Sequence, residues 1–207
     1  MLGMEYADIR HELVEVSRMI AGKGYTQASG GNVSCRIPRS GLFAIKRTAT
    51  NMDRMICDDV LIVDEQGTVV EGEGVPSKEV NFHLGIMKLR QDVGAVVHCH
   101  PCFAIGFANC GMEMPHTTVT SRKVVGRIPC VESAPAGSAE LCAHVLDAFR
   151  ADPGIKGILM KQHGICTVGP TLIAAYNIAD LVEQTCRQAY IMQKIDENRE
   201  FFNALRF

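Results

Sequence analysis

A stretch of sequence without a charged side chain, from Val93 to Met112, constrains the fold more than any other feature. A membrane-spanning helix needs about 20 predominantly apolar residues. This stretch is a poor match, because it contains two histidines, a proline, an asparagine and several glycines. We therefore interpret it as a core strand over 94–99 and a short helix over 102–110, and expect no membrane partner.

Helix and strand patterns are both spread along the remaining sequence. Apolar spacing predicts helices over 5–21, 76–89, 138–150 and 170–193, with a second helical piece to 205. Strands are expected within 29–37 and at 42–45, 60–63, 68–71, 157–160 and 166–168, and a meander covers 111–135. Because no linker divides the chain, we predict one domain over 1–207, of the α/β or α+β class around a single sheet.

Composition narrows the functional classes. The 207 residues, 47% of them apolar, suffice for one domain with a well-formed core. A net charge of -2 gives no electrostatic support for a nucleic-acid partner. Acidic and basic residues near the N-terminus argue against a secretory signal. Nine scattered cysteines are interpreted as free, mostly buried thiols in a reducing, cytoplasmic compartment.

Three histidines are the candidate metal ligands. His98 and His100 stand at alternate positions of the core strand, so both imidazoles would project from one face, with Cys99 on the other. His163 follows an apolar strand and could supply a third ligand from a neighbouring strand. Three histidines and an open position are typical of catalytic zinc. The alternative to metal binding is that His98 and His100 are polar residues at a strand end, and that His163 is a capping or core histidine.

A Cys-x-x-Cys pair, Cys99 and Cys102, is a competing zinc or redox pattern. It lacks a second such pair and is interleaved with the two histidines, which favours the histidine set.

Two further segments are candidate anion sites. In 76–79, Pro-Ser-Lys-Glu, the start of a helix would offer free N–H groups, with Ser77 and Lys78 adding a hydroxyl and a charge. Glu79 lies in the expected first turn, and His83, one turn later, is assigned a packing or supporting role. In 29–32, Ser-Gly-Gly-Asn, adjacent glycines would allow close backbone approach to an anion, or form a plain tight turn.

The ordered set of motifs resembles the class II aldolase/adducin family, in particular its sugar-phosphate aldolases. The similarity runs from about residue 8 to 190. The matching segments are Ser29-Gly30-Gly31-Asn32-Val33-Ser34, Arg47-Thr48-Ala49-Thr50, Pro76-Ser77-Lys78-Glu79, Val97-His98-Cys99-His100-Pro101 and Gln162-His163-Gly164 with Gly169.

This resemblance implies a central, largely antiparallel sheet flanked by helices, and a homotetramer with active sites between subunits. It implies that His98, His100 and His163 bind a divalent metal, usually zinc, with Mn²⁺ or Co²⁺ as alternatives. It implies that Glu79 is the catalytic acid/base, which can also act as a fourth ligand. Residues that would line a substrate phosphate pocket are Asn32, Thr48, Ser77 and Lys78.

The implied reaction is lyase chemistry, in which a ketose phosphate or a related sugar derivative is cleaved to dihydroxyacetone phosphate and an aldehyde. Cleavage leaves an enediolate, which a metal can stabilise as a Lewis acid. A carboxylate beside the metal can move the proton, and an anchored phosphate positions the reacting carbons.

Several departures from the family pattern leave the substrate open. Ala49 follows Thr48 where glycine is usual, Lys78 replaces a frequent serine, and Thr117 aligns with the tyrosine that serves fuculose-phosphate aldolases as proton donor. A decarboxylase of a 3-oxo sugar-acid phosphate or another β-keto acid is therefore the alternative.

Three other family functions are disfavoured. The related epimerases use aspartate where Glu79 stands, and another from a region that has none here, residues 111–131. A dehydratase of the methylthioribulose-phosphate type is the weaker option. A non-catalytic, adducin-like scaffold would lack the metal histidines, which this chain retains.

Overall fold

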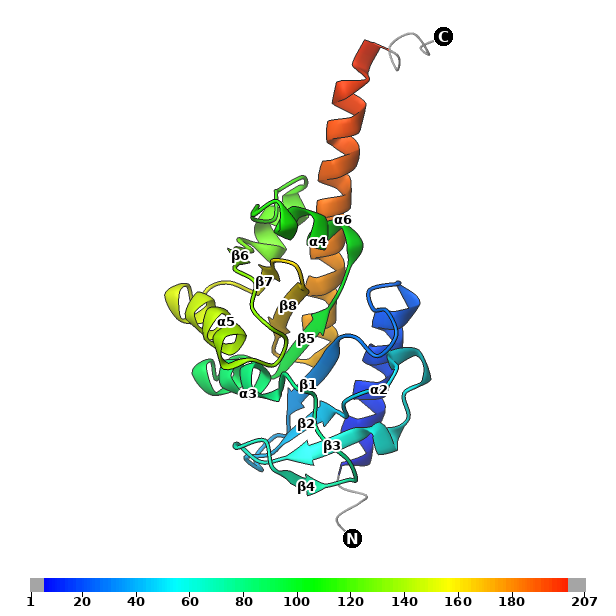
Figure 1. Ribbon diagram of the computed structural model, residues 1–207, viewed down its shortest axis with the longest axis vertical. Helices are drawn as coiled ribbons and strands as arrows, with labels where there is room; N and C mark the ends of the chain where they lie inside the picture. Colours follow the sequence, from blue (N-terminus) through cyan, green and yellow to red (C-terminus); the bar gives the residue numbers. More distant parts are fainter. Residues whose placement is uncertain (1–5, 201–207) are drawn as a thin grey trace.

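A computed structural model describes residues 6–200 of the chain, which form a mixed α/β fold around one sheet (Figure 1). The order of the strands in this sheet is β4-β3-β2-β1-β5-β8-β7-β6. Neighbouring strands are antiparallel except for β6 and β7, which are parallel. The predicted class, a largely antiparallel sheet flanked by helices, is confirmed. The strands are β1 (Asn32–Arg36), β2 (Phe43–Lys46), β3 (Val60–Val63), β4 (Val69–Glu71), β5 (Ala95–Cys99), β6 (Cys130–Val131), β7 (Gly157–Met160) and β8 (Gly164–Gly169).

Helices cover both faces of this sheet. One core contains side chains of α2, α4 and α6 together with Val97 and Cys99 of β5. The other core contains side chains of α3 and α5 together with Val96 of the same strand. The alternation expected for β5 therefore sends successive residues into two different cores. The helices are α2 (Ala7–Gly22), α3 (Val80–Leu89), α4 (Cys102–Asn109), α5 (Ala139–Ala151) and α6 (Leu172–Glu197).

The helix predicted from residue 76 begins later, at Val80, so this prediction was wrong at its start. Pro76 instead pairs with Arg47 in an isolated β-bridge. The Ser77 N–H donates to the Lys46 carbonyl oxygen, and the Thr48 N–H donates to the Val75 carbonyl oxygen. Long-range pairing to the end of β2 thus outweighs the local tendency of proline to open a helix.

Smaller differences lie in the C-terminal half. Strand β8 already begins at Gly164. The meander contains one π-helical turn, Ser121–Val125, and strand β6. Helix α6 runs unbroken to Glu197 and projects beyond the body of the molecule (Figure 1). The ends of the two predicted terminal helical pieces, residue 5 and residues 201–205, lie outside the described residues.

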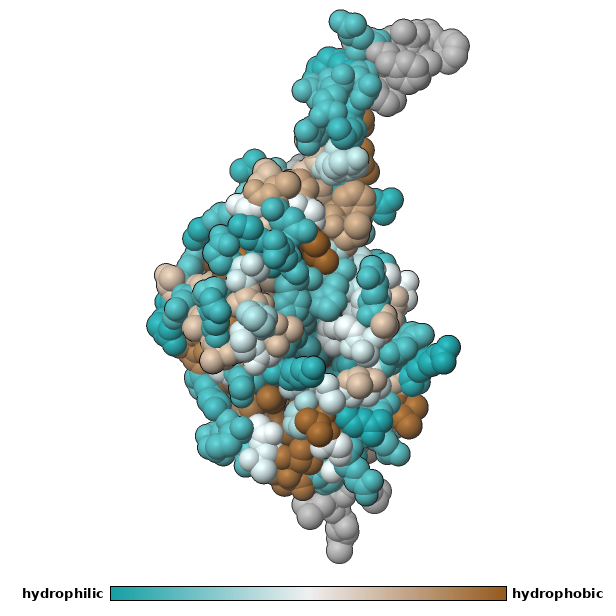
Figure 2. Space-filling view, in the orientation of Figure 1, coloured by the Kyte–Doolittle hydropathy of each residue, from teal (hydrophilic) through white to brown (hydrophobic). Residues whose placement is uncertain are grey.

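The visible surface is mainly hydrophilic, with apolar side chains in separate groups, including one along the projecting part of α6 (Figure 2). Within residues 6–200, no helix is long and apolar enough to cross a membrane.

Candidate metal centre and adjoining cavity

The three histidines meet where the central strands of the sheet end. His98 lies in β5, opposite Asn32 of β1 and Cys166 of β8, and His100 follows the end of the same strand. His163 comes from the turn between β7 and β8. In this turn Gln162 has a φ of 57°, a left-handed conformation that is uncommon outside glycine and compact polar residues. The tight turn brings the third imidazole beside the pair on β5.

The imidazoles present their ring nitrogens to one another. One ligand atom from each of His98, His100 and His163 lies within 4.8 Å of the others. The Nε2 atoms of His98 and His100 are 3.1 Å apart. Nδ1–H of His98 donates to the Ile165 carbonyl oxygen over 2.8 Å, which leaves its Nε2 with a free lone pair. Burial, and then the neighbouring imidazoles, lower the pKa of His98 and of His100, so both are neutral near pH 7.

His100 is held between two glycines. A methyl group on Gly30 would lie 2.8 Å from His100 Nδ1, and one on Gly164 would lie 2.7 Å from His100 Cδ2. The glycines of the segment 29–32 predicted close backbone approach to an anion or a plain turn. The structure shows instead that the Gly30 backbone lies against the imidazole of His100. A side chain at either position would displace the ring.

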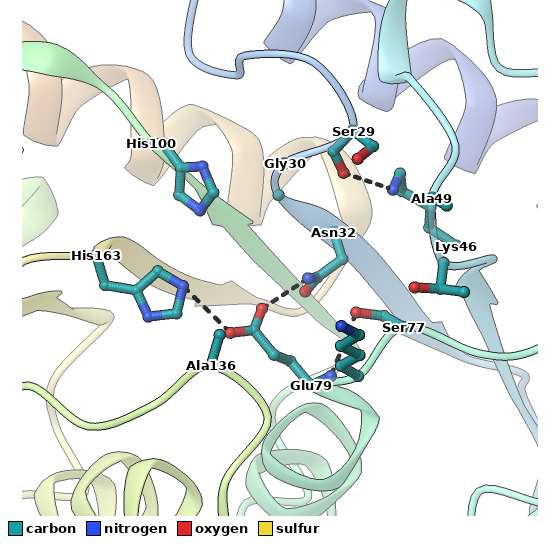
Figure 3. Close-up of a pocket in the computed structure, with 13 residues that line it drawn as sticks. Ser29, Gly30, Asn32, Lys46, Ala49, Ser77, Glu79, His100, Ala136 and His163 are labelled. Carbon is teal, nitrogen blue, oxygen red and sulfur yellow. Dashed lines mark hydrogen bonds and ion pairs between the residues drawn. The ribbon is translucent and has the colours of Figure 1, made fainter.

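Glu79 faces the three histidines from the start of α3. Its Oε2 lies 3.2 Å from Nε2 of His98, and its Oε1 lies 3.2 Å from Nε2 of His163. Nδ2 of Asn32 donates to Oε2 over 2.8 Å (Figure 3). Only 6% of Glu79 is exposed, and its Oε1 has no hydrogen-bond partner. A buried carboxylate oxygen without a partner is costly.

This donor set fits a divalent metal ion. Ring nitrogens of three imidazoles converge on one point, and the Glu79 carboxylate adds negative charge beside them. A cation at this point would neutralise that charge and give the unpartnered Oε1 atom a ligand role. Three histidines with a carboxylate are ligands that suit zinc and related divalent ions. The chain thus has a histidine group that could bind a metal.

A cavity of about 540 Å³ opens beside the histidines. It brings together the four residues predicted for the anion pocket with Glu79, His100 and His163, whereas His98 is fully buried behind them. Lys46 and Ala136 also contribute to the wall, although neither was expected there from the sequence. The lining residues are Ser29, Gly30, Gly31, Asn32, Lys46, Thr48, Ala49, Ser77, Lys78, Glu79, His100, Ala136 and His163.

Lys46 supplies a buried positive charge at this wall. The residue is 2% exposed, and its Nζ donates to the Ser29 carbonyl oxygen over 3.2 Å. Burial lowers the pKa of Lys46 to about 8, against a smaller opposing effect of Asp59. A lysine at the end of the apolar strand Phe43–Lys46, two residues before Thr48, was the available sequence signal.

The expected anion site at a helix start needs correction. The Ser77 N–H is bonded to Lys46, and the Glu79 N–H is bonded to the Ser77 hydroxyl over 3.3 Å. Neither group is free for a ligand. Side chains of Thr48, Ser77 and Lys78, rather than the amides of a helix first turn, are what this wall offers.

The cysteines that were the alternative metal or redox pair, and Thr117, do not line the cavity. All nine cysteines are free thiols; Cys99 is buried and Cys102 is exposed. The described residues contain no cysteine metal cluster. Thr117, at the position of the family's tyrosine, donates its hydroxyl to Gln188 of α6 over 2.8 Å.

Comparison with known proteins places the chain among relatives of one kind. A family model described as the class II aldolase and adducin N-terminal domain matches residues 11–190. An L-fuculose phosphate aldolase of Methanococcus maripaludis is 29% identical over 89% of this chain and 97% of its own length. A 5-methylthioribulose-1-phosphate/5-deoxyribulose-1-phosphate aldolase of Rhodospirillum rubrum is 32% identical over 91% of this chain and 83% of its own length.

Solved structures agree with the sequence relatives. The structure of an L-fuculose 1-phosphate aldolase superposes with a TM-score of 0.84 and 26% identity, covering 91% of this chain and 88% of that one. The resemblance inferred from the motifs is confirmed. So is the expectation of an enzyme of the lyase class, because aldolases are lyases.

Proposed function

The chain belongs to the family of class II aldolases and adducin N-terminal domains, and we propose that it is a metal-dependent aldolase. In this proposal it cleaves a ketose 1-phosphate to dihydroxyacetone phosphate and an aldehyde. One observation carries the proposal: Glu79, His100 and His163 line one end of a cavity, with His98 buried behind them, and Lys46 and hydroxyl groups line its other wall (Figure 3). The relative and the solved structure that are named as aldolases of sugar 1-phosphates support it.

Zinc is the proposed metal, held by His98, His100 and His163, with Mn²⁺ or Co²⁺ as alternatives. The nitrogen-rich ligand set favours zinc. When bound, the metal supplies Lewis-acid stabilisation of the negative charge that develops on the substrate during cleavage. The pKa values of His98 and His100 lie below their usual range, so these two imidazoles need no deprotonation near neutral pH.

Glu79 is the proposed proton carrier. Its carboxylate is buried beside the histidines, and the Asn32 amide holds one of its two oxygens. Carbon–carbon cleavage leaves a carbanionic fragment that must gain a proton at carbon, and the reverse reaction must remove it. A carboxylate at this position can perform both transfers.

The opposite wall is proposed to orient the phosphate. The Lys46 ammonium is charged below about pH 8, and the hydroxyls of Thr48 and Ser77 add neutral donors. Charge-assisted hydrogen bonds to a phosphate are stronger than neutral ones. Fixing one end of the substrate holds the scissile bond at the metal end of the cavity.

A decarboxylase is the second candidate, because Lys78 places another ammonium group at the cavity. Two lysines at one wall suit a substrate with both a phosphate and a carboxylate, such as a 3-oxo sugar-acid phosphate. The enolate left by loss of carbon dioxide needs the same stabilisation as the enediolate.

We also propose a homotetramer in the cytoplasm. Exposed apolar side chains on α6 support an assembly, because surface apolar groups of this kind mark interaction sites. These are Tyr190, Ile191, Met192 and Ile195. The free thiols support a reducing compartment.

The test is a product assay with zinc present, in which ketose 1-phosphates and 3-oxo acid phosphates are compared. Release of dihydroxyacetone phosphate from a ketose 1-phosphate is the expected result. Release of carbon dioxide from the 3-oxo acids alone would replace the aldolase by the decarboxylase. A zinc-loaded protein that turns over neither class would contradict both.

A further inference from the structure

A chain of four buried polar side chains leads from the sheet interior to the carboxylate of Glu79. Ser34 Oγ and His83 Nδ1 are 2.7 Å apart. His83 Nε2 is hydrogen-bonded to Asn32 Oδ1, and Asn32 Nδ2 is hydrogen-bonded to Glu79 Oε2. Ser34 and His83 are fully buried, and neither lines the cavity. Neither residue therefore touches a substrate.

The directions of these hydrogen bonds follow from the carboxylate outward. An ionised carboxylate only accepts, so Asn32 must present its NH₂ group to Glu79 and its oxygen to His83. The Nε2 atom of His83 must then carry a hydrogen. Burial lowers the pKa of His83 to about 3, so the ring is neutral and its Nδ1 accepts from the Ser34 hydroxyl. One arrangement satisfies all four side chains.

Two regular elements supply these residues in matching pairs. Asn32 and Ser34 are alternate residues of β1 and face the same side of the sheet. Glu79 and His83 are four residues apart at the start of α3, on one face of that helix. Each of the three hydrogen bonds joins a residue of β1 to a residue at the start of α3. The position of the Glu79 carboxylate is therefore fixed relative to the backbone of β1.

We propose that His83 and Ser34 are positioning residues that act through Asn32 to fix which oxygen of Glu79 exchanges the proton. Oε2 accepts a hydrogen bond from the Asn32 amide, whereas Oε1 makes no hydrogen bond and lies 3.2 Å from Nε2 of His163. The fixed amide excludes a proton from Oε2 and leaves Oε1 as the atom that takes the proton and returns it. In their absence the oxygen of the Asn32 amide loses its bonding partner, and the amide is no longer held at a fixed position against Oε2.

This inference rests on the proposed role of Glu79, and a half-reaction tests it without the aldehyde. The zinc-loaded protein is incubated with dihydroxyacetone phosphate in D₂O. NMR follows the exchange of deuterium into the carbon of dihydroxyacetone phosphate that would form the bond to the aldehyde. We expect His83→Leu to exchange about 10- to 100-fold more slowly, the usual cost of losing a supporting hydrogen bond. His83→Gln can donate to Asn32 and accept from Ser34, and we expect it to restore most of the rate.

Ser34→Ala and Ser17→Ala form the matched pair. Both serines are fully buried, but the Ser17 hydroxyl bonds only to the Leu13 carbonyl oxygen within α2. We expect Ser34→Ala to slow exchange and Ser17→Ala to leave it unchanged. A folded, zinc-loaded His83→Leu protein at the wild-type rate would overturn the proposal, as would equal losses in the two serine variants.

A second readout does not depend on activity. In the metal-free protein labelled with ¹⁵N-histidine, we expect His83 to show a neutral ring with hydrogen on Nε2. Hydrogen on Nδ1, or a charged ring, would contradict the proposed chain. If the wild-type protein exchanges no deuterium, the proposed aldolase function fails. The ¹⁵N spectrum then still shows whether the four side chains form the proposed series of hydrogen bonds.

Discussion

The two ends of the cavity are built in different ways. The metal end is made at the ends of the central strands, where the register of β1, β5 and β8 sets the positions of Asn32, His98 and the turn to His163. The anion end is made of Lys46, the last residue of β2, and of residues that follow β2 or precede α3. There Ala49 is left-handed, with a φ of 58°, and Lys78 is exposed.

Because of this difference, we expect substitutions at one end of the cavity to affect the reaction and substitutions at the other end to affect the choice of substrate. A change at the metal end disturbs the packing of the sheet, because His98 is fully buried and His100 has a glycine on either side. A change at Thr48, Ala49 or Lys78 can alter the charge and shape of the cavity while the strands stay in place. We infer that the reaction type is fixed by the sheet and the substrate by the two connecting segments.

The largest effect is expected from Glu79→Gln, which keeps the shape of the side chain and removes its basicity. Turnover should fall by about 10²- to 10⁴-fold, the usual contribution of a general acid or base. Metal analysis of the same protein should show that the ion is retained. Turnover close to that of the wild type would remove Glu79 from the mechanism.

Gly30→Ala should weaken metal binding, although it replaces none of the proposed ligands. The added methyl group meets the His100 ring, and such displacements cost about 10- to 100-fold in metal affinity. Gly106→Ala is the control, since nothing lies within 4 Å of its added methyl group. Titration of both variants with zinc measures the difference, and equal affinities would contradict the assigned packing of His100.

Lys46→Met should weaken the binding of a phosphorylated substrate by about 10-fold, as expected for a lost charge-assisted hydrogen bond. The wild-type protein should show a decline in kcat/KM as pH rises through about 8, because the pKa of Lys46 is lowered to about 8 and the cation is lost above it. The Lys46→Met protein should lack this decline. A pH profile that the substitution leaves unchanged would exclude Lys46 from substrate binding.

The smallest effect is expected from Ala49→Gly. Glycine relieves the left-handed strain at this position, worth about 1–2 kcal/mol, but its unfolded chain gains a comparable entropy. The free energy of unfolding should therefore change by less than about 1 kcal/mol in a urea titration. A loss of several kcal/mol would show that the anion end is coupled to the sheet as tightly as the metal end.

The sequence indicated the arrangement of the histidines better than that of the anion end, because the positions of His98 and His100 depend on local strand periodicity. Residues two apart on a strand share a face, so His98 and His100 followed from local periodicity alone. The meeting with His163 depends on strand pairing that no local pattern contains, and only the order of the motifs indicated it. The start of α3 was misplaced because Ser77 bonds to Lys46, a contact between distant segments.

Burial accounts for what was missed. A lysine in a sequence is ordinarily a surface residue, and the apolar strand before Lys46 indicates its burial but not its place in the cavity wall. The two glycines at 30 and 31 predicted close approach to an anion or a plain turn, and only the fold shows that the group near Gly30 is the His100 ring.

The most direct test of this account is the metal content of the purified protein and of three variants, His98→Ala, His100→Ala and His163→Ala. We predict about one divalent ion per chain in the wild-type protein and far less in each variant, with the circular dichroism of a folded sheet retained. A full complement of metal in any of the three, or a wild-type protein that binds no divalent ion at micromolar concentration, would contradict the assignment of the metal centre.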